Sequence, residues 1–290
     1  MVGTSSVFAT EILERRADEL RARFQSARPF PHLVLDDMLR LPPDVGDEFP
    51  PPDWDGWSGL GDTYQHNKYF CDVIERMPPT FSALIDELSR PRFLRALEKV
   101  TGIKRLIPDP YLSGGGLHLS GPGGILSPHT DFHHYRSLDI YRRVNVLVYL
   151  NQDWQESDGG CLELGDPSDP ASAAERQLVV PAFGRCVIFQ TDDRSVHGFP
   201  VPIADGRWRK SIALYYYTAA EASTFSGDAT TYWREHGDQS GVNKARMVVY
   251  RGLLQTSRGI SILAHLVNPN QGAKLFRTRL QNIKKSRQTP

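Results

Sequence analysis

Two histidines and one aspartate stand where they could bind a single metal ion. His129 and Asp131 lie two residues apart, and His197 follows 66 residues after the aspartate. On an extended strand, residues i and i+2 point to the same face, so the first two could bind one ion while Thr130 points away. Two imidazoles and one carboxylate are a ligand set that suits Fe(II) and leaves other coordination positions open. The three residues therefore predict a metal site.

A His-x-Asp triplet is weak evidence by itself, because the chain has nine histidines. A second copy, His236-Gly-Asp238, lies in a polar run without a strand pattern, and we interpret it as a solvated loop. The copy at His129 differs, because it is followed by a third candidate ligand and by a strand-like segment that begins with arginine. The combination, and not the triplet, indicates the site.

The arginine is Arg209, twelve residues after His197, at the start of a run with high β propensity. A buried arginine is costly unless it is paired, and its planar fork matches a carboxylate. Arg209 could therefore hold the distal carboxylate of a dicarboxylic cosubstrate. Taken alone, it could equally cap a strand edge or pair with Asp205.

Seven segments between residues 106 and 220 resemble, in order and spacing, the 2-oxoglutarate- and Fe(II)-dependent oxygenases of the prolyl 4-hydroxylase-like group. They are 114–118, 128–132, 143–154, 159–164, 187–192, 197–200 and 209–217. The resemblance implies a double-stranded β-helix (a jelly roll or cupin-like core) with helices packed outside it. It also implies Fe(II), 2-oxoglutarate and O₂ as cofactor and cosubstrates, with ascorbate as an optional supporting reductant.

The resemblance further implies a role for individual residues. His129, Asp131 and His197 would bind iron, and Arg209 would bind the tail of 2-oxoglutarate. Four residues are candidates for further cosubstrate contacts: Ser211, Tyr149, Asn145 and His118. Since residues 145, 147 and 149 share one face of a strand, Tyr149 would join Arg209 while Asn145 would reach the metal-bound end.

Alternatives remain for the weaker candidates. Tyr149 could be a core aromatic residue, and His118 could be only packed. Prolyl hydroxylases often carry a cosubstrate-binding tyrosine about ten residues before the first ligand, where this chain has Leu119. His133 and His134 could contact substrate or lie on a loop surface. Asp131 favours hydroxylation, because halogenating relatives have a small residue at this place.

The periodicity of apolar residues predicts mixed β structure with flanking helices in a single domain. Residues 1–105 form an N-terminal helical support and loop, 106–220 the β-helix catalytic core, and 221–290 a basic C-terminal helical segment. We expect strands at 116–120, 143–150, 161–164, 178–180, 185–190 and 209–217. We also expect one helix over 8–27 and two helical pieces within 78–101, broken near Pro91.

Composition excludes several classes of protein. Hydrophobic residues make up 40% of the chain and charged residues 23%, as in ordinary globular proteins. Three cysteines, an odd number without metal spacing, argue against a disulfide framework. We find no leader pattern and no membrane span, so we expect a cytoplasmic protein.

The formal net charge of zero hides an asymmetry. Residues 239–290 carry ten Lys or Arg and no Asp or Glu, which leaves residues 1–238 with a formal charge of −10. The basic charge of this segment suits docking to an acidic partner or to the chain's own acidic core. No nucleic-acid motif is present, so we expect no nucleic-acid partner.

Three function classes are compatible with these residues. The leading hypothesis is a dioxygenase that hydroxylates an unactivated C–H bond of a small molecule or a peptide residue and releases succinate and CO₂. A peptidyl prolyl hydroxylase is a specific form of it. The others are a non-catalytic barrel that binds iron or 2-oxoglutarate, and a docking protein that uses the basic segment. The sequence does not identify the substrate.

Overall fold

The computed structural model describes residues 6–61, 64–219 and 231–233, together with Val249, Gly252 and Thr256. The chain divides into two compact units, residues 1–236 and 237–290. The three described residues of the second unit are helical. Apart from these residues and 231–233, the predicted basic helical segment 221–290 lies outside the described residues, as does the second His-x-Asp triplet.

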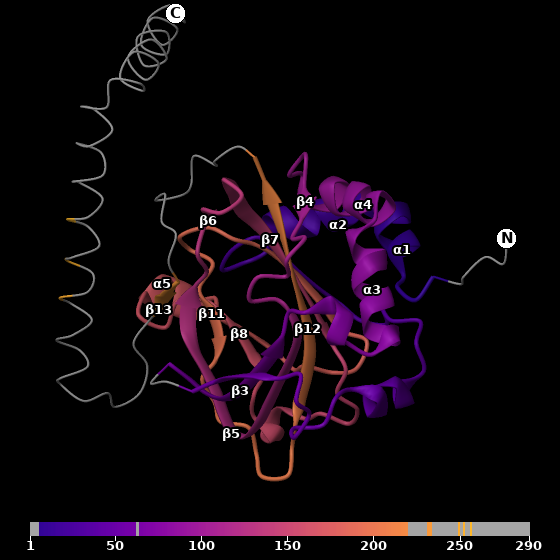
Figure 1. Ribbon diagram of the computed structural model, residues 1–290. Coiled ribbons are helices and arrows are strands. Elements are labelled where there is room, and N and C mark those ends of the chain that lie inside the picture. The colour runs from indigo at the N-terminus through magenta and orange to yellow at the C-terminus, as the bar shows by residue number, and fades with distance from the viewer. Residues whose placement is uncertain are drawn as a thin grey trace, which may run out of the picture. The chain divides into compact units, whose positions relative to one another are not determined.

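The first unit is built on an antiparallel sheet that curls almost into a barrel, as expected for a jelly roll (Figure 1). Its described strands are β1 (His32–Leu35), β2 (Ser58–Leu60), β3 (Gln65–Cys71), β4 (Ile107–Pro108), β5 (Gly116–Thr130), β6 (His134–Tyr135), β7 (Ile140–Tyr149), β8 (Leu162–Leu164), β9 (Gln177–Val179), β10 (Cys186–Gln190), β11 (His197–Phe199), β12 (Arg209–Thr218) and β13 (Tyr232–Trp233). The main order is β1-β10-β7-β12-β5-β11-β8-β9. Strands far apart in the sequence therefore lie side by side.

The six predicted strands are present with small shifts at their ends. β5 is much longer than predicted, because it continues through Gly121, Pro122, Gly123 and Gly124, which indicate a turn in the sequence. The hairpin of β2 and β3 was not predicted; it lies within residues 1–105, which we expected to form a helical support and loop. The sequence analysis also missed β13, because a polar run surrounds Tyr232 and Trp233.

Four helices gather on one side of the sheet (Figure 1). They are α1 (Thr10–Arg15), α2 (Ala17–Ser26), α3 (Pro79–Ser89) and α4 (Pro91–Thr101), so the first predicted helix is divided at Arg16. Pro91 is the first residue of α4. Proline lacks a backbone N–H, but at this position an N–H would have no hydrogen-bond acceptor within the helix. The sheet is tied to these helices at Tyr216 of β12, whose hydroxyl donates to Leu88 O at 3.0 Å. Within the described residues, no helix is long and apolar enough to cross a membrane.

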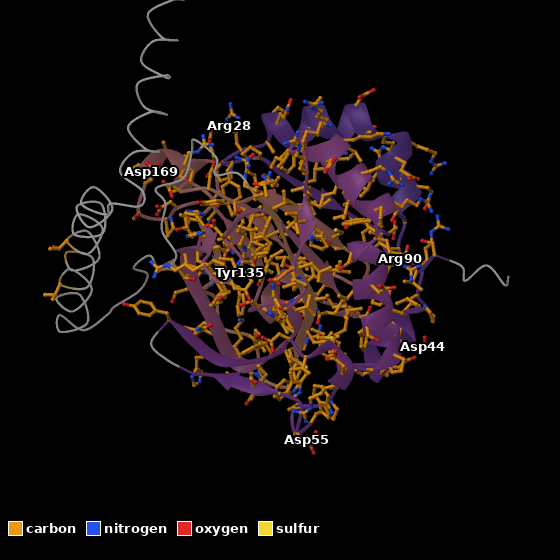
Figure 2. All side chains as sticks on the ribbon, turned by 45° about the horizontal axis from the view of Figure 1, so that its top comes forward. Arg28, Asp44, Asp55, Arg90, Tyr135 and Asp169 are labelled. Atoms are coloured by element: carbon orange, nitrogen blue, oxygen red, sulfur yellow. The ribbon has the colours of Figure 1, made fainter. Side chains whose placement is uncertain are left out.

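The remaining short elements are α5 (Pro170–Ala174) and the 3-10 helices η1 (Pro43–Glu48), η2 (Ile74–Arg76) and η3 (Glu156–Asp158). Figure 2 shows side chains crowded between the sheet and the helices, whereas the labelled charged residues lie at the periphery. Arg28, Asp44 and Arg90 are examples. The three cysteines are free thiols and buried, as expected.

β5 joins the two parts of the sheet that form the candidate site. Its first half pairs with β12, where Arg209 lies opposite Ser120. Its second half pairs with β11, where His197 lies opposite His129. A single strand therefore connects the arginine strand to both histidines. β3 runs along the other edge of β5, with Lys68 opposite Ser120.

The packing of the helices generates a prediction about stability. Leu97 of α4 is fully buried in the main apolar cluster. Leu97→Ala should lower the free energy of unfolding by about 2–5 kcal/mol, because lost contacts and a cavity add. Arg95→Ala, on the exposed face of the same helix, should change it by less than about 0.5 kcal/mol. Urea titrations of the two variants measure this, and equal effects would contradict the assigned helix face.

Candidate active site

The two histidines and the aspartate meet across the pairing of β5 and β11. His197 and His129 are direct cross-strand partners, and Asp131 follows on the same face as His129. One ligand atom from each of the three lies within 4.8 Å of the others. All three side chains are buried. The predicted constellation is therefore assembled in space.

The two imidazoles are oriented by the backbone. Nδ1–H of His129 donates to Ser127 O and Nδ1–H of His197 to Ser195 O, each at 2.9 Å. The Nε2 atoms consequently face Asp131, at 3.7 Å from Oδ1 for His129 and 3.6 Å from Oδ2 for His197. Burial lowers the pKa of His197 to about 4, which keeps its ring neutral near pH 7. Metal binding requires a neutral imidazole in which one nitrogen donates a hydrogen bond and the other faces the position of the metal ion.

The carboxylate of Asp131 is held by two neighbours on β7. Asn145 Nδ2 donates to Oδ2 at 2.7 Å, and Arg142 Nη2 lies 2.9 Å from the same oxygen. Arg142 Nε also donates to Asn145 Oδ1 at 2.8 Å, so the three side chains form one network. Burial would raise the pKa of Asp131, but Arg142 and the imidazoles outweigh it and hold this pKa well below its usual value. Asp131 is therefore ionised, as a ligand of Fe(II) must be.

Arg142 contacts Asp131 in the candidate site and was not among the residues that we predicted there. It is only 2% exposed, and its guanidinium lies 3.3 Å from the ring centre of Tyr215 and 5.2 Å from that of Phe132. Arg143 follows it directly, and its Nη1 donates to Thr218 Oγ1 at 3.3 Å. Regular alternation from Asn145 would put Arg143 on the cavity face, but the register of β7 against β12 shifts at this point, and Arg142 lines the cavity instead.

Arg209 lies in a second cluster, at the start of β12. Its Nε donates to Gly160 O at 2.8 Å, and Nη2 donates to the hydroxyl of Tyr149 at 3.2 Å. Ser211 lies two residues on, with Oγ at 3.5 Å from Nη1, and lines the same cavity as Arg209. Arg209 is 5% exposed, and within the described residues its guanidinium contacts Gly160, Tyr149 and Ser211 rather than Asp205, the alternative that the sequence left open.

Tyr149 and His118 flank Ser211 on the neighbouring strands. Tyr149 packs behind Arg209, with its ring centre 4.9 Å from the guanidinium carbon. His118 lines the cavity, whereas Leu119 belongs to the apolar core. Because side chains alternate along β5, His118, and not Leu119, points to the face of the sheet on which Arg209 lies. Burial, followed by the charge of Lys68, lowers the pKa of His118 well below its usual value, so its ring is neutral.

A cavity of about 210 Å³ connects these clusters. Its wall includes His129, Asp131, His197, Arg209, Ser211, Asn145 and His118, together with Arg142, Gln65 and Lys68. His133 and His134 point elsewhere and contact carboxylates, Asp193 and Asp139, at 2.9 Å each. The donor set thus fits Fe(II) at one end of the cavity and a carboxylate at the other.

Residues 115–217 match the family model of the 2OG-Fe(II) oxygenase superfamily. A prolyl hydroxylase of Trichoplax adhaerens, solved with a hypoxia inducible factor peptide fragment, is 18% identical, with a TM-score of 0.51 over 71% of this chain and 91% of that one. The epimerase SnoN of nogalamycin biosynthesis, solved with Fe³⁺, alpha ketoglutarate and nogalamycin RO, is 15% identical, with a TM-score of 0.51 over 79% and 91%. These two likenesses show the fold. No curated protein matches the chain.

The buried pair of Arg142 and Asp131 generates the second prediction. Arg142→Met should lower the free energy of unfolding of the metal-free protein by about 3–5 kcal/mol, because an unpaired carboxylate stays buried. A divalent metal ion should recover part of this loss, since it supplies positive charge to the same carboxylate. Thermal unfolding with and without Mn(II) measures both effects.

Arg143→Met is the matched control, because this half-buried neighbour donates to Thr218 Oγ1 and does not line the cavity. This variant should have nearly the same free energy of unfolding as the native chain, and Mn(II) should stabilise it no more than it stabilises the native chain. Equal destabilisation by both variants, or no recovery for Arg142→Met, would contradict the pairing.

Proposed function

We propose that this chain, whose residues 115–217 belong to the 2OG-Fe(II) oxygenase superfamily, hydroxylates an unactivated C–H bond of a small molecule or a peptide residue. One observation carries the proposal. The two Nε2 atoms and the carboxylate of Asp131 converge within 4.8 Å, in a cavity whose wall also contains Arg209. This geometry supports His129, Asp131 and His197 as iron ligands.

Fe(II) held by His129, Asp131 and His197, together with 2-oxoglutarate, would supply O₂ activation: one oxygen atom would enter the C–H bond and the other the succinate that is released with CO₂. The chain's residues bind and orient. Arg209 pairs with the distal carboxylate of 2-oxoglutarate, and Ser211 and the Tyr149 hydroxyl stand beside that pair. Asn145 and Arg142 hold Asp131 in one orientation.

Peptidyl prolyl hydroxylation is the alternative for the substrate. The prolyl hydroxylase of Trichoplax adhaerens was solved with a peptide, which supports a peptide reaching such a cavity from outside. A non-catalytic barrel is disfavoured, because the ligand set, the arginine and its partners are complete. Three buried free thiols support a reducing compartment, and we propose the cytoplasm.

The metal site gives the test of the proposal. Anaerobic titration should find about one Fe(II) per chain, as one three-residue ligand set predicts. The double variant His129→Ala/His197→Ala should lose this binding and all succinate formation. Unchanged Fe(II) affinity in that variant would contradict the proposal.

Arg209 gives a separate prediction. Arg209→Ala should raise the KM for 2-oxoglutarate about tenfold or more, because a charge-assisted hydrogen bond is lost. Arg209→Lys should recover only part, since the bidentate fork is absent. Arg207→Ala is the control, because Arg207 contacts Asp158 at 2.9 Å instead of the cavity. A normal KM for Arg209→Ala would rule out this role.

A further inference from the structure

Three tyrosines lie in sequence between the candidate iron site and the protein surface, and neither iron binding nor cosubstrate binding explains their arrangement. We propose that Tyr215, Tyr217 and Tyr135 carry oxidising equivalents away from the iron site when O₂ is activated there and no substrate is bound. An external one-electron reductant, such as ascorbate or a thiol, then reduces Tyr135. This inference rests on the proposed function and adds a second activity to the same site, the disposal of an oxidant that has no substrate.

Tyr215 begins this pathway at the cavity wall, which also contains His129 and Asp131. It lies opposite Asn145 on β7, and Asn145 donates to the carboxylate of Asp131. The guanidinium of Arg142 lies 3.3 Å from the ring centre of Tyr215, and its Nη2 lies 2.9 Å from Asp131 Oδ2. A single side chain therefore separates the Tyr215 ring from a proposed iron ligand.

Tyr217 and Tyr135 continue the pathway toward solvent. Tyr217 follows two residues after Tyr215 on the same face of β12, roughly 7 Å further along the strand. Both belong to one apolar cluster, against which Tyr135 packs. The ring centres of Tyr217 and Tyr135 are 5.9 Å apart. Tyr217 is fully buried and Tyr135 is half-buried, so short steps between neighbouring phenol rings connect the cavity wall to a side chain that water reaches.

A second chain of rings leads to the same surface residue but suits this task less well. Phe132 lines the cavity, and its ring centre lies 6.4 Å from that of Tyr135. A benzene ring is much harder to oxidise than a phenol, and it has no hydroxyl proton to release when it is oxidised. The tyrosines therefore provide the easier route for an oxidising equivalent.

The groups beside the rings set the direction of transfer. The positive charge of Arg142 opposes the removal of an electron from Tyr215. The Tyr215 hydroxyl donates to Gly114 O at 2.8 Å, and a peptide carbonyl is too weak a base to take its proton. The Tyr217 hydroxyl donates instead to Asp109 Oδ2 at 3.2 Å, and a carboxylate can accept the proton. An oxidising equivalent therefore passes through Tyr215 and is stabilised on Tyr217.

Both buried phenols hold their protons until they are oxidised. Burial raises the pKa of Tyr215 to about 12 and also raises the pKa of Tyr217. Loss of the proton thus accompanies loss of the electron, and it occurs where Asp109 is in contact. This coupling is what makes Tyr217 a suitable intermediate position.

Each passage moves one electron inward. The iron site takes an electron from Tyr215, which takes one from Tyr217 as the phenolic proton of Tyr217 moves to Asp109. Tyr217 then takes an electron from Tyr135 and recovers its proton, while Tyr135 releases its own proton to water. The reductant restores Tyr135 with one electron, and water returns the proton. After the cosubstrate is consumed without substrate, the iron site holds two oxidising equivalents, so two passages and two protons yield Fe(II) and one water molecule.

The test locates the radical on the full chain. The chain is loaded with Fe(II) and 2-oxoglutarate, without substrate or reductant, and exposed to O₂ in the presence of the spin trap tert-nitrosobutane. Peptide mass spectrometry identifies the residue that carries the trap, and electron paramagnetic resonance of freeze-quenched samples detects tyrosyl radicals. A second series uses hydrogen peroxide in place of O₂ and 2-oxoglutarate. Peroxide oxidises the bound Fe(II) directly, so this series does not depend on cosubstrate turnover.

In the native chain we expect the trap on Tyr135. Tyr217→Phe should abolish this adduct and leave Fe(II) binding unchanged, because Tyr217 does not line the cavity. Tyr215→Phe should abolish it as well, and either variant is sufficient if the other fails to fold. Tyr216→Phe is the matched control and should keep the adduct. Tyr216 is as buried as Tyr217 and lies between the two on β12, but its hydroxyl donates to Leu88 O, on the helix side of the sheet.

The absence of an adduct on Tyr135 in the native chain would overturn the inference. Persistence of the adduct in a folded Tyr215→Phe or Tyr217→Phe variant would do the same, and so would its loss in Tyr216→Phe. The double variant His129→Ala/His197→Ala, with the same total Fe(II), should give no adduct, since an adduct there would show that iron in solution oxidises Tyr135 directly.

The peroxide series separates these results from a failure of the proposed function. A native chain that binds no Fe(II) contradicts the function itself. A chain that binds Fe(II), which peroxide then oxidises, without a radical on Tyr135 contradicts only the tyrosine pathway.

Discussion

The site depends on the register between β5 and β11. His129 and His197 are direct partners across this pair, so a shift of one residue would turn one imidazole out of the cavity. Gly198 helps to fix that register, because a Cβ there would lie 2.6 Å from Leu126 O. The hydrogen bonds from both Nδ1 atoms to carbonyls two residues earlier then leave the two Nε2 atoms facing one point. Backbone pairing, more than side-chain packing, defines where a metal ion can bind.

Buried charge is the second constraint. Asp131 and Arg142 are both nearly inaccessible to solvent, and Asn145 bridges them. Such a pair is weak support for stability, since desolvation opposes the attraction. Its value here is orientation, because one carboxylate oxygen is held by β7 while the other faces His129. The aromatic rings of Tyr215 and Phe132 enclose the guanidinium and keep water from competing for that oxygen.

The sequence predicted the jelly-roll class and the positions of its main strands, because these strands alternate in polarity and end at Gly, Pro and Asp. It also predicted His129, Asp131, His197 and Arg209 as site residues. His129 and Asp131 are two residues apart, and Arg209 begins a strand-like run that follows His197. It could not predict Arg142, because regular alternation from Asn145 selects Arg143, and the register shift that puts Arg142 in the cavity wall has no sequence pattern. Lys68 was missed for a different reason. The left-handed backbone at Asn67 reverses the alternation of β3, and no residue pattern shows that reversal.

The cavity wall is built from two parts of the sheet that are held differently. The metal and arginine clusters lie on β5, β7, β11 and β12, which are fixed by mutual pairing. Gln65 and Lys68, which also line the cavity, lie on the hairpin of β2 and β3, which joins the sheet along the edge of β5 alone. Insertions or substitutions in this hairpin would therefore reshape one wall of the cavity while the pairing of the other four strands stays in place.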